Sequence, residues 1–225
     1  MSKQLFRILS ALSCIAGNIM LSVSFAINPG PPNNPTSAQL IAFGEQYATS
    51  IFVGAWLQAV SPLFIVMFAC ALVCLADATN RLSGWMTMFG SVILVMVSLI
   101  EVSFYLSAFA PNPSSMGLIS LDLIHAIQHL YFIIAAPALF LPLGVVILSS
   151  RVLPRVFAYL AFLLGTAFAI LGVVYLSALT LPLFVQAFAG VQTLWWLGAA
   201  ITLLVLTRKK AATNAVKEQE PALDL

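Results

Sequence analysis

The stretch TSIFVGAWLQAVSPLFIVMFACALVCLA, residues 49–76, contains no charged side chain over its whole length and decides the fold class. A soluble domain carries about a quarter charged residues, whereas this chain of 225 residues is 7% charged and 62% hydrophobic. An α-helix needs about 20 apolar residues to cross the hydrocarbon core of a bilayer. Residues 49–76 therefore predict a transmembrane helix, and the composition predicts a chain built mostly of such helices.

Apolar runs of similar length occur on both sides of this stretch. The predicted spans are residues 5–27, 49–76, 85–109, 119–148, 155–179 and 183–206. The connections between them are short or rich in turn residues, which leaves no room for a separate soluble domain. We expect an all-α bundle of six transmembrane helices within residues 1–207. A polar tail, residues 208–225, should follow and be disordered beyond its first turn.

The first run could also be a signal peptide, because Lys3 and Arg7 precede it and residues 24–26 resemble a cleavage site. Its apolar stretch after Arg7 is longer than the roughly 7–15 residues of a signal-peptide core. It also contains Gly17 and Asn18, a small and polar pair that suits packing between helices. We therefore expect this run to be retained as a true span.

With six spans, every basic residue falls on one side of the membrane. The loops on the other side, around residues 28–48, 110–118 and 180–182, contain no Lys or Arg. Lys and Arg near span ends are held in the cytoplasm, so both termini are predicted to be cytoplasmic. An odd number of spans would place basic loops on both sides. The nine basic residues are Lys3, Arg7, Arg81, Arg151, Arg155, Arg208, Lys209, Lys210 and Lys217.

Polar side chains within the spans gather in the half of the membrane opposite the basic residues. Burying such groups in hydrocarbon is expensive, so an intramembrane ionisable residue marks a candidate site. Counting from the span ends, Glu101 should lie about 12 Å deep, and His125 and His129 about 9 and 15 Å deep. The other half is almost purely apolar, which predicts a polar pocket open to the outside and closed below by apolar packing. The predicted pocket residues are Glu101, His125, His129, Gln58, Asn18, Gln192 and Tyr105.

His125 and His129 are four residues apart, so both project from the same face of a helix. Two such imidazoles could bind one Zn, Cu or non-haem Fe ion, with Glu101 of the neighbouring span as a third ligand. Alternatively, Glu101 and one histidine form a buried hydrogen-bonded pair that fixes the two spans together. A third interpretation is a pocket for a small ligand or a lipid. The spacing lacks the HExxH pattern of helix-borne metallopeptidases, so it indicates no hydrolase.

Two local features should shape the spans. Residues 37–47 are expected to continue the second span outside the membrane as a short amphipathic helix, with Ser37 as its N-cap. Pro62, Pro137 and Pro142 lie within spans, where proline can kink or end a helix.

The order of these segments resembles a known family. A basic start and a first span lead to NPGPPNNP (residues 28–35), SAQLIAF (37–43) and AWLQAVSPLFIVMFACALVCLAD (55–77). Later, LFLPLGVVILSSRVLPRVFAYLAFLLG (139–165) leaves the membrane and re-enters at a Leu-Pro-Arg turn. Both parts resemble uncharacterised bacterial six-helix integral membrane proteins, a domain of unknown function. The resemblance implies six helices in a bacterial inner membrane, and it implies no activity or site residues.

From these observations we expect a multi-pass protein of the bacterial inner membrane. It should bind a small ligand or a lipid through the polar pocket, or support a membrane-protein partner. Its expected partners are membrane lipids and such a ligand or protein, with no nucleic acid. No cofactor and no enzymatic activity are expected on this interpretation. The alternative is a metal-dependent membrane enzyme or metal carrier that holds a divalent transition metal with His125, His129 and Glu101.

Overall fold

The computed structural model describes residues 2–30, 35–109, 116–177 and 182–219, and every regular element in these ranges is helical. Six helices are long and apolar enough to cross a membrane, which confirms the predicted all-α class and the six candidate spans. The first, third and fifth connections between the predicted spans fall partly outside the described residues. The elements are α1 (Lys3–Ile27), α2 (Ser37–Leu75), α3 (Leu82–Ala108), α4 (Met116–Leu130), η1 (Tyr131–Ala135), α5 (Ala136–Ser150), α6 (Arg155–Ser177) and α7 (Pro182–Gln219).

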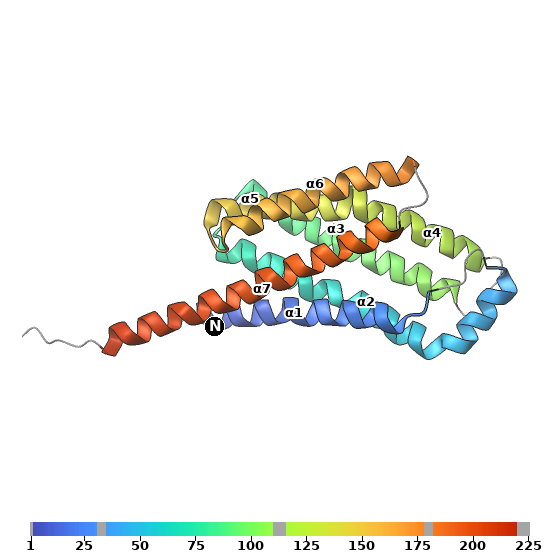
Figure 1. Cartoon of the computed structure of the whole chain (residues 1–225), viewed down its shortest axis with the longest axis horizontal. Helices are drawn as coiled ribbons and strands as arrows, with labels where there is room; N and C mark the ends of the chain where they lie inside the picture. The colour runs from blue at the N-terminus through green and yellow to red at the C-terminus, as the bar shows by residue number, and fades with distance from the viewer. Residues whose placement is uncertain (1, 31–34, 110–115, 178–181, 220–225) are drawn as a thin grey trace, which may run out of the picture.

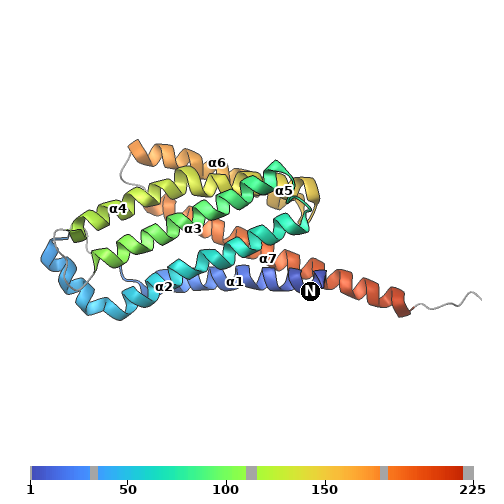
Figure 2. The ribbon, with the colours of Figure 1, turned by 180° about the vertical axis from the view of Figure 1, so that it is seen from behind.

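The helices lie side by side in an elongated bundle, and successive spans run in opposite directions (Figures 1 and 2). The chain begins at the end of the bundle where α2 leads into α3 and α5 leads into α6 (Figure 1). We call this the basic end and the opposite one the far end. The described basic side chains at the basic end are Lys3, Arg7, Arg81, Arg151, Arg155, Arg208 and Lys209.

Helix α1 buries its small side chains and turns its large ones outward. Ser13 Oγ donates a hydrogen bond to the Phe64 carbonyl of α2 at 3.1 Å, and a Cβ on Gly17 would lie 2.8 Å from the Ser61 carbonyl oxygen. Helices in lipid associate through such close packing, which small residues permit. The packing role predicted for the Gly17–Asn18 pair is therefore confirmed for Gly17, whereas the amide of Asn18 bonds within α1. The buried residues are Ser10, Ala11, Ser13, Cys14, Gly17, Asn18 and Ser24, and the exposed large ones are Leu5, Leu9, Leu12, Ile19, Val23 and Phe25.

Helix α2 bends at Tyr47, whose φ of −113° and ψ of 16° are not helical. Residues 37–46 form the expected helical extension, which we call the amphipathic segment. The N-cap is Thr36 rather than the predicted Ser37. Thr36 forms a capping box with Gln39, in which Gln39 Oε1 accepts from the Thr36 N–H at 2.8 Å. Ser37 could not form this box, because the residue three positions on is Leu40.

The fourth span is interrupted by the π-helical turn η1, which joins α4 to α5. The Ala136 N–H donates to the Tyr131 carbonyl, five residues back. Pro137 follows at once and has no N–H to donate, so the regular helical ladder cannot pass this point unbroken. A π turn accommodates one extra residue and is frequent at functional sites. Proline was expected to kink or end the helix, and at Pro137 the structure instead shows a π-helical turn just before the proline.

Pro142 has a second effect, on packing between helices. It cannot donate to the Ala138 carbonyl four residues back, which leaves that oxygen without its helical donor. Gly90 of α3 approaches at this point, and a Cβ there would collide with the Ala138 carbonyl oxygen. Backbone therefore meets backbone where α3 crosses α5.

An aromatic cluster fills the middle of the bundle. The Phe140 ring centroid lies 5.3 Å from those of Trp195 and Trp196, and Phe68 lies edge-on to Trp196 at 6.2 Å. Trp195 Nε1 donates to the Phe157 carbonyl at 3.0 Å, which satisfies one polar group inside the core. This cluster joins α2, α5, α6 and α7.

Helix α7 continues past the last span, and Figure 1 shows it projecting beyond the bundle at the basic end. The chain stays helical to Gln219, so the expected disorder beyond the first turn of residues 208–225 is wrong up to this residue. Residues 211–219 are rich in Ala, Lys, Glu and Gln, which favour helix, and extending an existing helix needs no new nucleus. The last part of the predicted tail, residues 220–225, lies outside the described residues.

Candidate functional site

Glu101 of α3 lies half-buried between the neighbouring spans. Its Oε1 accepts a hydrogen bond from Gln128 Nε2 of α4 at 3.0 Å, and the Gln58 side chain of α2 also hydrogen-bonds the carboxyl. Three successive spans thus meet at one carboxyl group, and we call Glu101, Gln58 and Gln128 the Glu101 site. No Lys or Arg within the described part of the chain pairs with this carboxyl.

The backbone beside Gln58 explains why α2 and α3 are fixed in register there. Pro62 has no N–H, so the Gln58 carbonyl loses the donor that a regular helix would supply four residues on. Ser98 Oγ of α3 donates to this carbonyl instead, at 3.1 Å, and Ser61 Oγ approaches it at 3.4 Å. Ser98 is one helical turn before Glu101. The Gln58 carbonyl, which Pro62 leaves without a helical donor, therefore accepts from a side chain of α3 close to Glu101.

The two histidines lie on α4 on either side of Gln128. His125 is exposed and His129 is half-buried. They lie within electrostatic range of each other, as the four-residue spacing predicts. The described residues hold no cluster of three or more His, Cys, Asp and Glu side chains arranged to hold a metal ion. The hydrogen bond shown from α4 to Glu101 comes from Gln128, so the metal set and the Glu–His pair stay predictions.

Two other predicted pocket residues have partners away from the Glu101 carboxyl. Gln192 of α7 accepts a hydrogen bond from the Tyr131 hydroxyl of η1. Asn18 is buried and donates to the Cys14 carbonyl of its own helix at 2.8 Å. Tyr131 is three residues from Gln128 in the same span, so the Gln192 contact lies about one helical turn from the Glu101 site. The Asn18 amide is therefore bonded within α1 and not to the Glu101 site.

Tyr105 lies one turn beyond Glu101, toward the far end. Its ring packs edge-on against Phe109 with centroids 5.0 Å apart, and it contacts the cluster formed by Leu40 and Phe43 of the amphipathic segment. The Tyr105 hydroxyl is buried and has no hydrogen-bond partner among the described residues. A buried unsatisfied hydroxyl costs about 1–3 kcal/mol, so this oxygen is available to a bound group.

Sequence reasoning missed Gln128 and Tyr131. Gln128 stands between the two histidines in the same apolar run, and an amide in a span is a natural neutral partner for a carboxyl. Its presence in IHAIQHL was the available signal. Tyr131 follows three residues later and therefore shares a helix face with Gln128. The π turn that brings Tyr131 to Gln192 leaves no such mark in the sequence.

The fold and this site define a multi-pass α-helical protein with a carboxyl group held among its candidate spans. Comparison with protein-family models, curated proteins and solved structures finds no match to the chain. The resemblance to the bacterial six-helix family therefore stays an expectation.

Proposed function

We propose that the chain is a multi-pass protein of the bacterial inner membrane that binds a small ligand or a lipid headgroup at the Glu101 site. The observation that carries the proposal is the Glu101 carboxyl, which is held by two neutral amides from two other helices. An ionisable group within a span is costly to bury, so its presence there marks a site of binding, transport or pairing. Amide partners fix its position without supplying an opposite charge.

The surroundings of Glu101 favour a ligand that carries hydrogen-bond donors, such as an amine or a hydroxyl. A carboxylate offers about four lone-pair sites, more than two amide donors occupy. The exposed His125 of α4 and the Tyr105 hydroxyl of α3, which is unpaired among the described residues, both lie within about one helical turn of the residues of the Glu101 site. A ligand with hydrogen-bond donors would occupy the remaining lone pairs of the Glu101 carboxyl and could also bond the Tyr105 hydroxyl.

The ligand test is native mass spectrometry of the full chain purified in a mild detergent. We expect a co-purified mass on the wild type that is lost or reduced at least tenfold in Glu101→Gln, which keeps the shape of the side chain. Glu45→Gln is the matched control, because Glu45 is exposed on the amphipathic segment and lies outside the Glu101 site. No bound mass on the wild type, or equal retention in Glu101→Gln, would refute the proposal.

A second candidate function is metal binding by His125, His129 and Glu101, as an enzyme or a carrier. The adjacent imidazoles on α4, next to Gln128, favour it. Its test is elemental analysis after purification without chelators. Stoichiometric Zn, Cu or Fe in the wild type, lost in His125→Ala/His129→Ala, would favour this function. No metal in either protein would exclude it.

The proposed orientation places both termini in the cytoplasm. It is supported by the gathering of Lys and Arg at the basic end, since basic residues near span ends are retained in the cytoplasm. Alkaline-phosphatase fusions test it directly. A fusion after Asn112 should be active and one after Arg151 inactive, and the reverse result would overturn the orientation.

A further inference from the structure

A cavity of about 470 Å³ opens at the basic end between the α5–α6 turn and α7. Arg151, Leu153 and Pro154 of the turn line it, together with Arg155 at the start of α6 and Leu206 of α7. It lies at the opposite end of the spans from the Glu101 site. We propose that this cavity binds the phosphate headgroup of an anionic phospholipid.

The α5–α6 turn holds its two arginines in a defined frame. Arg151 ends α5 in the left-handed conformation, with φ of 56°, which reverses the chain toward α6. Leu153 is 2% exposed and packs into the main core, so it anchors the turn from below. The Phe157 N–H donates to the Pro154 carbonyl at 3.0 Å and closes the first turn of α6. The arginines therefore extend from a fixed backbone.

The charge on this turn has no counterpart in the described protein. Both arginines are exposed, and neither pairs with an acidic group of the described residues. Asp77 is the acidic residue with a described side chain at this end, and it does not line the cavity. Arg208 follows Leu206 on α7 and adds to the positive charge. An anion from outside the chain is the partner that this charge distribution fits.

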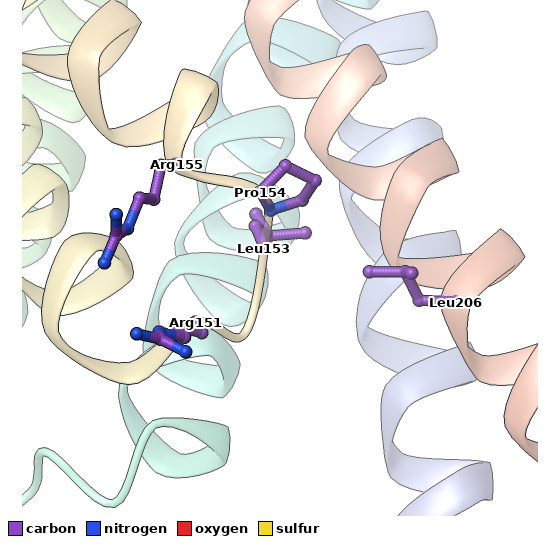
Figure 3. A pocket seen from close by; sticks show the side chains of 5 residues that line it. All are labelled: Arg151, Leu153, Pro154, Arg155 and Leu206. Atoms are coloured by element: carbon purple, nitrogen blue, oxygen red, sulfur yellow. The ribbon is translucent and has the colours of Figure 1, made fainter.

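The cavity combines this charge with an apolar wall at the level where a span ends. Arg151 directly follows the candidate span Gly117–Ser150, and Arg155 begins the next one. Figure 3 shows both arginine side chains extending from the turn on the side away from α7, while Leu206 points from α7 toward Leu153 and Pro154. Guanidinium groups bind phosphate oxygens through paired N–H donors. The two arginines that line the cavity thus suit a phosphate, and the apolar side chains of Pro154 and Leu206 suit the first carbons of an acyl chain.

A phospholipid meets both requirements, whereas inorganic phosphate meets only the first. Basic pockets between membrane helices are known to select anionic headgroups, and each Lys or Arg near an anionic membrane surface contributes about fivefold to affinity. Removing both arginines should therefore weaken binding by about 30-fold.

The test is native mass spectrometry of the full chain in detergent, titrated with phosphatidylglycerol or with phosphatidylcholine. We expect phosphatidylglycerol adducts at lower lipid concentration than phosphatidylcholine adducts, with a loss of about 30-fold in Arg151→Gln/Arg155→Gln. Lys3→Gln/Arg81→Gln removes the same charge at the same end from exposed side chains outside the cavity and should bind as the wild type does. Equal loss in both double variants would overturn the cavity as the site.

A second variant separates the cavity from surface charge alone. Leu206→Trp fills the space beside the turn and keeps both arginines, so it should also lower phosphatidylglycerol binding. Unchanged binding in this variant would refute a site between the turn and α7. Inorganic phosphate added at the concentration of the lipid should not displace it. Displacement would show that the cavity binds free phosphate and would overturn the lipid proposal.

Discussion

Substitution of Gly90 by alanine tests whether backbone contact between α3 and α5 holds the bundle together. A Cβ on Gly90 would collide with the Ala138 carbonyl and lie 2.7 Å from the Leu139 nitrogen. Ordinary contacts to carbon begin at about 3.4 Å, and the Ala138 oxygen is the nearest atom, so the two helices would have to separate by roughly 1 Å. A gap of this size forfeits about a quarter to a half of each dispersion contact that it opens.

The free energy of unfolding should fall because two opposing effects differ in size. Overpacking against a neighbour that cannot move costs about 1–3 kcal/mol, and here the neighbour is backbone. Alanine in place of glycine within a helix contributes about 1 kcal/mol in the other direction. Because the neighbour is backbone, the overpacking cost should lie in the upper part of that range, at about 2–3 kcal/mol. We therefore expect Gly90→Ala to lower the free energy of unfolding by about 1–2 kcal/mol.

The assay is titration of the purified protein with sodium dodecyl sulfate in mixed micelles, followed by tryptophan fluorescence. Gly190→Ala and Gly198→Ala are matched controls in α7. A Cβ on Gly190 would meet nothing within 4 Å, and one on Gly198 would meet the Phe157 ring at an ordinary 3.4 Å. Both controls should unfold at the same or a higher detergent fraction than the wild type. If Gly90→Ala behaves as they do, the close approach of α3 to α5 does not stabilise the fold.

Three further changes test other contacts. Tyr131→Phe removes the hydroxyl that donates to Gln192 and should lower the free energy of unfolding by about 1 kcal/mol in the same titration; no change would contradict an interhelical role for this bond. Ser13→Ala removes the hydrogen bond to the Phe64 carbonyl but keeps a small residue, so the loss should be about 0.6 kcal/mol, and a loss above about 2 kcal/mol would refute this accounting. Thr36→Ala should cost about 1 kcal/mol through its cap, seen as faster hydrogen exchange confined to the amphipathic segment. Faster exchange throughout α3 would show that the cap stabilises more than this segment.

The spans could be predicted because the signal for them is a property of composition over about 20 residues. The 49–76 stretch and its five counterparts meet that condition without reference to one another. The amphipathic segment was also predictable, since it shows a helical pattern beyond the membrane length. Its N-cap was not, because Thr36 and Ser37 are both good caps and only the partner at Gln39 distinguishes them.

The candidate site was predicted in its central residue and not in its partners. Glu101 stands out because a carboxyl within a span is rare. Whether α4 presents His125, Gln128 or His129 to it depends on the rotation of α4 about its own axis. Hydropathy carries little information on that rotation when both lipid and protein contacts are apolar. The helical tail to Gln219 was missed for a different reason. A polar sequence can be either helix or coil, and here it extends a helix that the last span has already formed.

The π turn at Tyr131–Ala135 fixes the rotation of α4 about the helix axis relative to α5 within one span. On its near side lie Gln128 and the histidines, and beyond it lie Leu139, Leu143 and Ile147, which are fully buried in the core. Each residue of an α-helix advances the chain by about 100°, so deleting one residue from the turn would rotate α4 by about that angle relative to α5. Such a deletion would leave length and hydropathy nearly unchanged while moving Gln128 off Glu101. Chains alike in every span but one residue shorter here would share the bundle and lack the site.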